Sequence, residues 1–304
     1  MIKILTVSSA NMDFVMDTPK IPAAGESIIC NGGYRYIPGG KGANSAVAVA
    51  RLGGESLFCT SVGRDANGNA LLDLYNNEGI DTRFIYRAND APTGLAAIMV
   101  EGNGQNRIMV FPGANRKITT EAIDLAIEEK PEALFMQLET SVETVLYAAK
   151  SASEAGIPIV IDAGPADPEF PLEQLPELEI FSPNETETEI FTGIAPTDEK
   201  SCELAVEKLK ERVKAKHFCI KLGGKGCYVD GKTVPSFKVE AVDTTAAGDT
   251  FTAALTLEYL RDRDIFKAAR FACAAAAIVV SKRGASSSIP HRAQVDSFIA
   301  ENRS

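Results

Sequence analysis

Small residues lead directly into a carboxylate in the stretch DTTAAGDTF, residues 243–251. A helix that begins near Gly248 leaves its first backbone N–H groups without partners, and Ala246 and Ala247 have no bulk to keep an anion away from them. Asp249, on the first turn, would stand beside that anion. This arrangement is suited to phosphoryl transfer, in which the amides hold developing charge and the carboxylate accepts a proton from a hydroxyl. A plain helix start, with small residues for packing and an acid favoured by the helix dipole, is the alternative.

A second glycine-rich stretch, PGGKGANSAVAVARLGG (residues 38–54), also precedes an expected helix. It contains neither a Walker A loop nor the G-x-G-x-x-G pattern. Its glycines would let a ligand approach the backbone closely, and Lys41 and Asn44 would offer polar contacts. Spacing alone equally fits a flexible turn that leads into a helix.

Polar residues follow two of the expected strands. Asn11 and Asp13 come directly after the first strand, and Glu139 comes directly after LFMQL. In open parallel sheets, ligands bind beyond the carboxyl ends of the strands, so these residues are candidates for ligand contacts. Solvated acids in surface loops are the alternative.

The motif NETE places Asn184 and Glu187 at the start of another expected helix. The spacing is that of a capping box, and a second possibility is that Glu187 orients a hydrated Mg²⁺. His217 and His291, the two histidines of the chain, lack metal-ligand spacing and are treated as incidental.

Short apolar strands alternate with amphipathic helices along the chain. This pattern predicts an α/β fold in which helices cover both faces of a mostly parallel sheet, within a single domain of residues 1–304. Strands are expected at 2–7, 57–62, 134–138, 157–161 and 218–222. Helices are expected at 42–52, 68–78, 142–155, 184–191, 202–210, 248–259 and 265–281.

Two segments, 14–37 and 92–111, interrupt this alternation. The first contains strand-like pieces at 27–30 and 34–37, and the second reads TGLAAIMV, a turn EGNGQ, then RIMVF. The second pattern is typical of a hairpin. We expect both segments to form a small β-structured lid that projects from the main sheet.

The composition excludes several classes of protein. The formal net charge of −10 argues against a nucleic-acid binder, which needs a basic face. The longest apolar run, 271–280, is shorter than the roughly 18 residues of a membrane span, and the N-terminus reads as a strand rather than a signal peptide. The cysteines show no C-x-x-C spacing and are expected to be reduced packing residues, which favours a soluble, cytoplasmic protein. They are Cys30, Cys59, Cys202, Cys219, Cys227 and Cys273.

Together these motifs resemble the PfkB-type carbohydrate kinases, the ribokinase family. DTTAAGDTF resembles the C-terminal signature of that family, and GGKGANSAVAVARLGG resembles the N-terminal one. The order N-x-D, GGKGAN, Q-L-E, N-x-x-E, DTTAAGD and KRGASSSIP is similar to that of the family from residue 4 to about residue 300.

The resemblance implies a ribokinase-like three-layer sandwich and an ATP-dependent kinase that acts on the 5-hydroxyl of D-ribose. It implies that Asp249 is the catalytic base and that Ala246, Ala247 and Gly248 form the anion hole. The positions that match sugar contacts are Asn11, Asp13, Gly40, Lys41, Asn44, Glu139 and Asp249. Those that match nucleotide contacts are Asn184, Glu187, Lys221, Gly223, Gly226 and Gly248, with Glu187 tied to Mg²⁺ through water.

The same resemblance implies a monovalent-cation site for K⁺ and a homodimer formed through the lid. The cation pattern maps mostly through backbone carbonyls to Asp243, Thr245, Val279, Lys282, Gly284 and Ser288. Ser8, Ser45 and Lys221 depart from residues frequent in the family, and the first two neighbour the expected sugar pocket. Deoxyribose, another furanose or a nucleoside therefore remain alternative substrates. A non-catalytic sugar-binding regulatory module is the alternative from another class.

Overall fold

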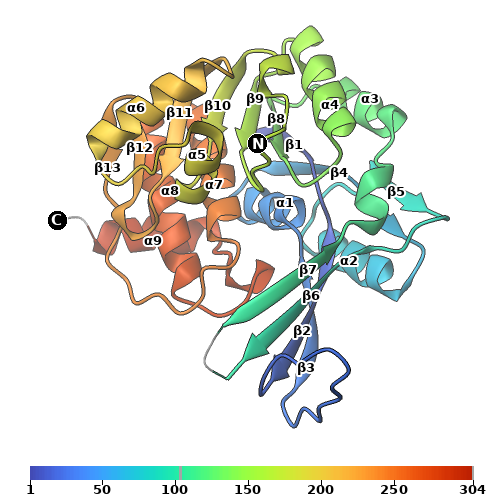
Figure 1. Ribbon diagram of the computed structural model, residues 1–304. Coiled ribbons are helices and arrows are strands. Elements are labelled where there is room, and N and C mark those ends of the chain that lie inside the picture. The colour runs from blue at the N-terminus through green and yellow to red at the C-terminus, as the bar shows by residue number, and fades with distance from the viewer. Residues whose placement is uncertain (103–104, 303–304) are drawn as a thin grey trace.

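A large sheet runs through the middle of the molecule (Figure 1). The computed structural model describes residues 1–102 and 105–302, and within them nine strands form this sheet in the order β13-β12-β11-β10-β9-β8-β1-β4-β5. Neighbours from β11 to β5 are parallel, whereas β12 and β13 pair antiparallel. The mostly parallel sheet expected from the sequence is thus confirmed. The strands are β1 (Lys3–Val7), β4 (Glu55–Gly63), β5 (Ile85–Ala88), β8 (Ala133–Gln137), β9 (Ile159–Asp162), β10 (Leu178–Ser182), β11 (Ala215–Lys221), β12 (Cys227–Val229) and β13 (Lys232–Val234).

Helices cover both faces of the sheet, and each face has its own apolar core. Because the central strands carry apolar side chains on both sides, they can be buried between two helical layers. The three-layer arrangement is therefore confirmed. One layer contains α1 (Lys41–Arg51), α2 (Ala66–Asn77), α7 (Ala247–Asp262), α8 (Ile265–Val280) and α9 (Arg292–Glu301). The other contains α3 (Thr120–Glu128), α4 (Val142–Glu154), α5 (Glu185–Thr192) and α6 (Glu199–Lys210).

Helix α7 is buried along most of its length, from Asp249 to Tyr259. It packs most closely against α8 and α1. Small side chains such as Ala253 and Ala254 on α7 and Ala272 on α8 are completely buried, and they let the helices approach one another closely. This packing fixes the first turn of α7 relative to the carboxyl ends of the central strands.

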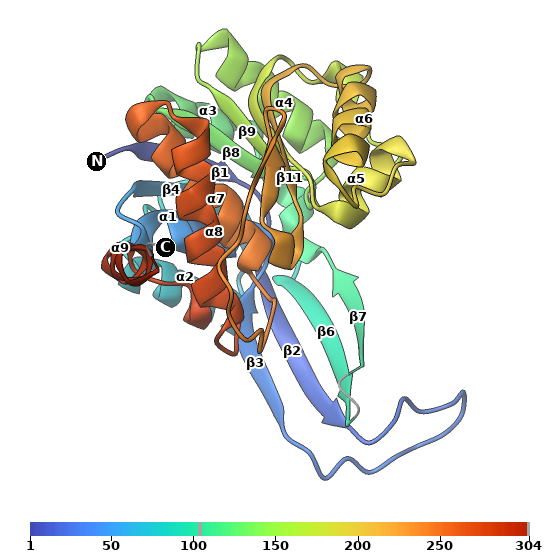
Figure 2. The same cartoon turned by 90° about the vertical axis from the view of Figure 1, so that its left-hand side faces the viewer.

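A second, four-stranded sheet projects from the main body (Figure 2). Its order is β3-β2-β6-β7, where β2 and β6 are parallel and the other pairs antiparallel. Its strands are β2 (Asn11–Thr18), β3 (Tyr34–Gly39), β6 (Gly94–Glu101) and β7 (Asn106–Phe111). The expected hairpin of β6 and β7 is confirmed, although its predicted turn at 101–105 lies partly outside the described residues. We call this four-stranded sheet the lid.

One expectation about the lid is wrong. Residues 27–30 form no strand, because β2 pairs directly with 34–39 and leaves the intervening segment without a partner strand. Asn11 and Asp13 lie on β2, so the lid sheet begins slightly before the expected boundary near residue 14. The lid strand therefore carries the predicted ligand contacts directly to the edge of the main sheet.

Several elements were not expected from the sequence. They are helices α3 and α9 and strands β5, β12 and β13, and these three strands have four residues or fewer, too few for a clear periodic pattern. Five cysteines are buried as expected, but Cys30 is exposed in the segment that leads to β3, so its assignment as a packing residue is wrong. In the described part of the chain, no helix is long and apolar enough to cross a membrane.

Candidate active site

Ala246, Ala247 and Gly248, the residues predicted to form an anion hole, lie at the start of α7. Ala246 has a left-handed backbone conformation with a φ of 63°, which is unusual for a residue other than glycine and turns the chain sharply into the helix. The N–H of Ala247 donates to the carbonyl of Thr244 at 3.2 Å. The N–H groups of Ala246 and Gly248 have no acceptor among the described residues. Two of the three expected amides are therefore open to an anion, while the third closes the turn.

The carboxylate of Asp249 lies beside these amides and is 6% exposed. Its Oδ2 accepts a hydrogen bond of 2.8 Å from Asn44 Nδ2, and its Oδ1 lies 3.8 Å from Lys41 Nζ. Burial raises the pKa of Asp249, and the positive charge of Lys41 opposes that rise. The first turns of α1 and α7 thus meet, which brings together residues about 200 positions apart in the chain.

Two more carboxylates, those of Glu139 and Asp13, lie near Asp249. Glu139 Oε2 accepts hydrogen bonds from Ser9 Oγ and, at 3.2 Å, from the backbone N–H of Lys41. The pKa of Asp13 is raised to about 7, first by burial and then by the negative charges of Glu139 and Asp249. The same negative charges, above all that of Asp249, raise the pKa of Lys41. We call Asp13, Glu139 and Asp249 the carboxylate cluster.

Asn11 and Gly40 lie at the same edge of the sheet. Asn11 Oδ1 accepts a hydrogen bond of 2.7 Å from Asn115 Nδ2, and Asn115 Oδ1 accepts one of 2.8 Å from the backbone N–H of Ala10. Gly40 has a φ of +93°, and a Cβ there would lie 2.7 Å from the backbone nitrogen of Asn11. Only glycine therefore fits between the first turn of α1 and the start of β2.

Some buried polar atoms around the cluster have no partner within the described chain. They include Asn44 Oδ1, Ser8 Oγ and Gln137 Oε1, whereas Gln137 Nε2 donates to Ser45 Oγ at 2.7 Å. Buried polar atoms nearly always have partners in folded proteins. These atoms are therefore candidates to bind a polar ligand or ordered water.

Asn184 and Glu187 form a capping box at the start of α5. The side chain of Asn184 accepts from the N–H of Glu187, and the side chain of Glu187 accepts from the N–H of Asn184, both at 2.8 Å. Burial raises the pKa of Glu187, and Lys221 opposes that rise. A Cβ at Gly164 would lie 2.2 Å from Glu187 Oε1, so the carboxylate is closely enclosed. The capping prediction is confirmed.

The expected nucleotide loop follows β11. The backbone of Lys221 bridges to Asn184. Gly223 and Gly226 have φ values of +51° and +104°, and a Cβ at Gly226 would lie 2.0 Å from the carbonyl oxygen of Val234. The backbone conformation of this tight turn explains both glycines.

The two segments predicted to hold a monovalent cation lie side by side. Asp243 Oδ1 accepts from the N–H of Thr245 at 3.0 Å and from its hydroxyl at 2.6 Å, and Asp243 Oδ2 accepts from the N–H of Gly284 at 3.0 Å. Partial burial raises the pKa of Asp243. The hydrogen bonds from Thr245 and Gly284 outweigh this effect and keep the pKa below its usual value. Asp243 therefore ties the turn before α7 to the loop after α8.

The other predicted cation residues are bonded within their own turns. The carbonyl of Val279 accepts from the N–H of Lys282 at 3.1 Å, and Ser288 Oγ donates to the carbonyl of Ala285 at 2.8 Å. Lys282 is exposed, while Val279 and Ser288 are buried. In residues 1–102 and 105–302, no group of three His, Cys, Asp or Glu side chains is arranged to hold a metal ion.

Sequence reasoning missed several residues that this region brings together. Ser9 and Asn115 hold Glu139 and Asn11 in place, and Asp162 and Thr252 lie beside Lys221. Asp162 ends β9, so the rule that selected Glu139 would also have selected this carboxylate. Asn115 lies in a short turn, and its sequence context carries no comparable signal.

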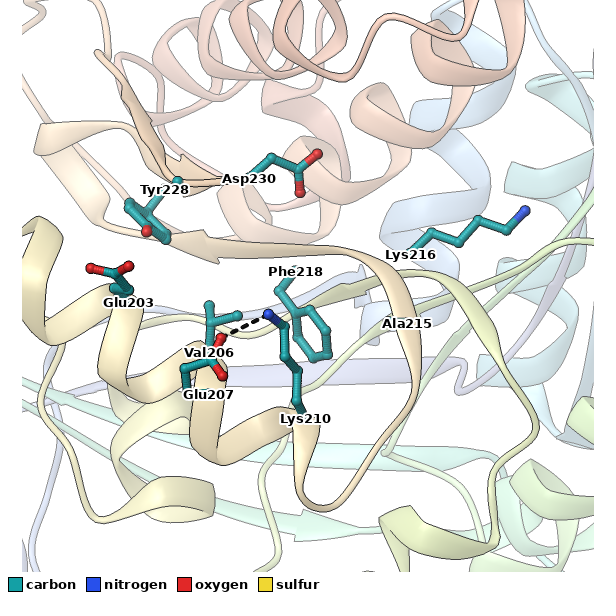
Figure 3. Close-up of a pocket in the computed structure, with 10 residues that line it drawn as sticks. Glu203, Val206, Glu207, Lys210, Ala215, Lys216, Phe218, Tyr228 and Asp230 are labelled. Carbon is teal, nitrogen blue, oxygen red and sulfur yellow. Dashed lines mark hydrogen bonds and ion pairs between the residues drawn. The ribbon is translucent and has the colours of Figure 1, made fainter.

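A separate surface pocket of about 220 Å³ lies between α6, β11 and β12 (Figure 3). Glu207 and Lys210, one turn apart on α6, form an ion pair of 2.8 Å at its wall. Ala215 and Lys216, which also line it, are at the start of β11, whereas Lys221 is at its end. The pocket is thus at the opposite end of this strand from the open amides of α7.

The site therefore combines helix-terminal amides without acceptors in the described chain, a buried carboxylate on the same turn and a set of polar groups nearby, an arrangement suited to phosphoryl transfer to an alcohol. A family model described as "pfkB family carbohydrate kinase" matches residues 1–292. The chain belongs to this family and is accordingly an enzyme of the sugar-kinase class.

Named relatives are similar over nearly the whole chain. The chain is 37% identical to a ribokinase of Haemophilus influenzae, over 98% of each sequence. It is 31% identical to a deoxyribokinase of Salmonella typhi, over 98% of this chain and 99% of the relative. The structure of Arabidopsis thaliana ribokinase complexed with ribose and ATP is 30% identical, with a TM-score of 0.89 over 98% of this chain and 99% of that one.

Proposed function

We propose that this protein transfers the terminal phosphoryl group of ATP to the 5-hydroxyl of D-ribose, giving D-ribose 5-phosphate. The observation that carries the proposal is the position of Asp249, buried beside the open amides of Ala246 and Gly248 and next to the polar groups of α1 and β2. The similarity to ribokinases supports the choice of sugar and of phosphoryl donor.

The sugar would bind between the lid and the first turn of α1. Asn11, Asn44 and the carboxylate cluster offer acceptors and donors for several hydroxyl groups, and Asn44 Oδ1 has no partner among the residues that the structure describes. Lys41 and the backbone at Gly40 border the same region. Asp13 and Glu139 would accept from sugar hydroxyls, while Asp249 is left for the hydroxyl that reacts.

In the chemical step, the 5-hydroxyl oxygen attacks the terminal phosphorus. The new O–P bond forms as the bond between this phosphorus and the bridging oxygen breaks, and the bond's electron pair leaves with ADP. The hydroxyl proton passes to the carboxylate of Asp249. Such a transition state is loose, so catalysis rests on positioning and on stabilisation of charge by the amides of Ala246 and Gly248.

The nucleotide would lie along the turn after β11, against Gly223 and Gly226, with Asn184 and Glu187 nearby. Mg²⁺ accompanies ATP in phosphoryl transfer and neutralises charge on its phosphates. Glu187 is enclosed and already caps α5, so it fits a contact made through water better than direct coordination.

A K⁺ ion would bind where Asp243 joins the turn before α7 to the loop after α8. Carboxylate, hydroxyl and carbonyl oxygens are the donors that such a hard cation prefers. Thr245 and Gly284 are held against Asp243, and Val279, Lys282 and Ser288 lie in the neighbouring turns. An ion here would fix the turn that presents the amides.

We further propose that the chain acts as a homodimer through the lid and works in the cytoplasm as a single-domain enzyme. Strand β7 is exposed along its whole length, including Ile108, Val110 and Phe111. Tyr34 and Tyr36 on β3 are also exposed. A free edge strand with apolar side chains is suited to pairing with a second copy.

2-Deoxy-D-ribose is the second candidate substrate, because the relatives include a deoxyribokinase at 31% identity. The two sugars differ in the 2-hydroxyl alone. A site built to pair this hydroxyl rejects the analogue that lacks it, whereas a site without that contact accepts both.

The test is a substrate panel of D-ribose, 2-deoxy-D-ribose, D-fructose and adenosine, with ATP, Mg²⁺ and K⁺, followed by ADP release. We expect the highest kcat/KM for D-ribose.

Asp249→Asn should lower kcat by about 10²–10⁴-fold while sugar binding is kept. Asp262→Asn, an exposed carboxylate at the other end of α7, should leave kcat unchanged. If no compound of the panel is phosphorylated, the sugar-binding regulatory module becomes the better account.

A further inference from the structure

Lys221 is a buried lysine at the end of β11, with only 9% of its surface exposed. Its Nζ donates to Asp162 Oδ1 at 2.8 Å and to Thr252 Oγ1 at 3.4 Å. A Cβ built on Gly248 would lie 3.8 Å from this same Nζ. The ammonium group therefore stands against the first turn of α7, where the open amides are.

The partners of Lys221 are themselves held in place. The hydroxyl of Thr252 donates to Asp162 Oδ2 at 2.7 Å, so each oxygen of this carboxylate has its own donor. Asp162 ends β9 and Lys221 ends β11, on either side of β10 in the sheet. The pair thus lies at the carboxyl edge of parallel strands, where ligands of open α/β sheets bind.

Lys221 still has hydrogen-bonding capacity to spare. An ammonium group has three donors, and two acceptors are found for it among the described residues, Asp162 and Thr252. Burying a charged pair is costly, and an apolar pair of similar volume often stabilises a protein as well or better. The location and the remaining donor indicate a role in binding negative charge.

The other lysine of the site has a different partner. Lys41 lies 3.8 Å from the carboxylate of Asp249, the proposed base. Lys221 Nζ instead lies near the Cβ position of Gly248, whose N–H has no acceptor among the described residues. Both positive charges therefore lie against the first turn of α7, Lys41 at Asp249 and Lys221 at Gly248.

We propose that Lys221 donates to the phosphoryl group while it passes from ATP to the sugar, and that Asp162 and Thr252 are positioning residues for it. This inference rests on the proposed function and adds a residue to it. A fixed positive charge stabilises the charge of a phosphoryl group in transfer, as backbone amides do, and is worth most in a site from which water is excluded.

The first experiment separates this role from a purely structural one. Lys221→Met should lower kcat by about 100-fold, with the KM for the sugar unchanged. The double variant Lys221→Met/Asp162→Asn removes both charges of this ion pair, so it should unfold at a temperature closer to that of the wild type than the single variant does, but keep the low kcat. Lys216→Met, at the other end of the same strand and paired with Glu179 at 2.7 Å, is the matched control and should have the kcat of the wild type.

The second experiment reads binding rather than turnover. ADP with Mg²⁺ and aluminium fluoride, a mimic of the phosphoryl group in transfer, should bind Lys221→Met/Asp162→Asn about 100-fold more weakly than the wild type. ADP alone should bind both proteins equally. Equal binding of the mimic, or recovery of the wild-type kcat in the double variant, would overturn the proposal. Failure of the wild type to phosphorylate any sugar would instead overturn the proposed function, and binding of the mimic would still report on Lys221.

Discussion

Asp13→Asn removes one negative charge from the carboxylate cluster, and we expect it to stabilise the ligand-free protein at alkaline pH. Burial, followed by the charges of Glu139 and Asp249, raises the pKa of Asp13 from 3.8 to about 7. A shift of about 3 pH units corresponds to roughly 4 kcal/mol of unfolding free energy once the group is ionised in both states. Since Asp13 is partly exposed, solvent screening reduces this value, and we expect a gain of about 2–4 kcal/mol.

The sign of the pH dependence follows from the raised pKa. The folded protein binds the Asp13 proton more tightly than the unfolded chain does. The resulting stabilisation is complete below pH 3.8 and is lost as the pH rises through about 7. Relative to Asp13→Asn, the wild type should lose about 1.4 kcal/mol of unfolding free energy per pH unit between those values.

Urea unfolding of both proteins without sugar, at pH values between about 5 and 8, measures this difference. Asp17→Asn, on the same strand and paired with Arg35 at the surface, is the matched control and should show no such slope. At the same time, Asp13→Asn should raise the KM for the sugar about 10–100-fold, because a hydrogen bond to a charged group is lost. A stability difference between wild type and Asp13→Asn that does not vary with pH would refute the account of the cluster.

Three further outcomes are expected. Asn115→Ala removes the amide that holds Asn11, so it should cost about 1–3 kcal/mol in urea unfolding and raise the KM for the sugar; an unchanged KM would contradict this role. Gly40→Ala adds a Cβ 2.7 Å from a backbone nitrogen at a φ of +93°, so the yield of folded protein should fall sharply, as measured by circular dichroism of the soluble fraction. Ile108→Asp together with Val110→Asp places charges on the exposed strand β7 and should convert a dimer to a monomer in analytical ultracentrifugation. Both side chains are exposed in the monomer, so any fall in the unfolding temperature should be no larger than the loss of the dimer contact explains.

Local patterns in the chain were enough to predict much of the architecture. The alternation of apolar strands and amphipathic helices predicted the covered parallel sheet, and the turn EGNGQ between two β-rich runs predicted the hairpin of β6 and β7. These signals depend on residues close together in sequence, which is why they can be interpreted without the fold. The strand expected at 27–30 was wrong because a strand also needs a partner strand, which a local pattern does not show. In the fold, β2 pairs with β3 and leaves 27–30 without a partner.

The candidate site was predicted in its parts but not in its connections. Asp249 was selected from its position after small residues at a helix start, and Glu139 from its position after a strand. Asn115, whose hydrogen bond reaches Asn11 across 104 positions, had no local signal. Asp162 and Thr252, which hold Lys221, are likewise separated from it by 59 and 31 positions.

By itself, the sequence determined most of the longer strands and helices and which residue types stand at their ends, because periodicity, capping and glycine placement act over a few residues. Only the tertiary structure decided which of those ends meet. The order of strands in the sheet and the packing of α7 between α1 and α8 bring Lys41, Asn44 and Asp249 together, and they place Lys221 beside Gly248. Electrostatic effects such as the raised pKa of Asp13 follow from that proximity and from burial, neither of which any single stretch of the chain contains.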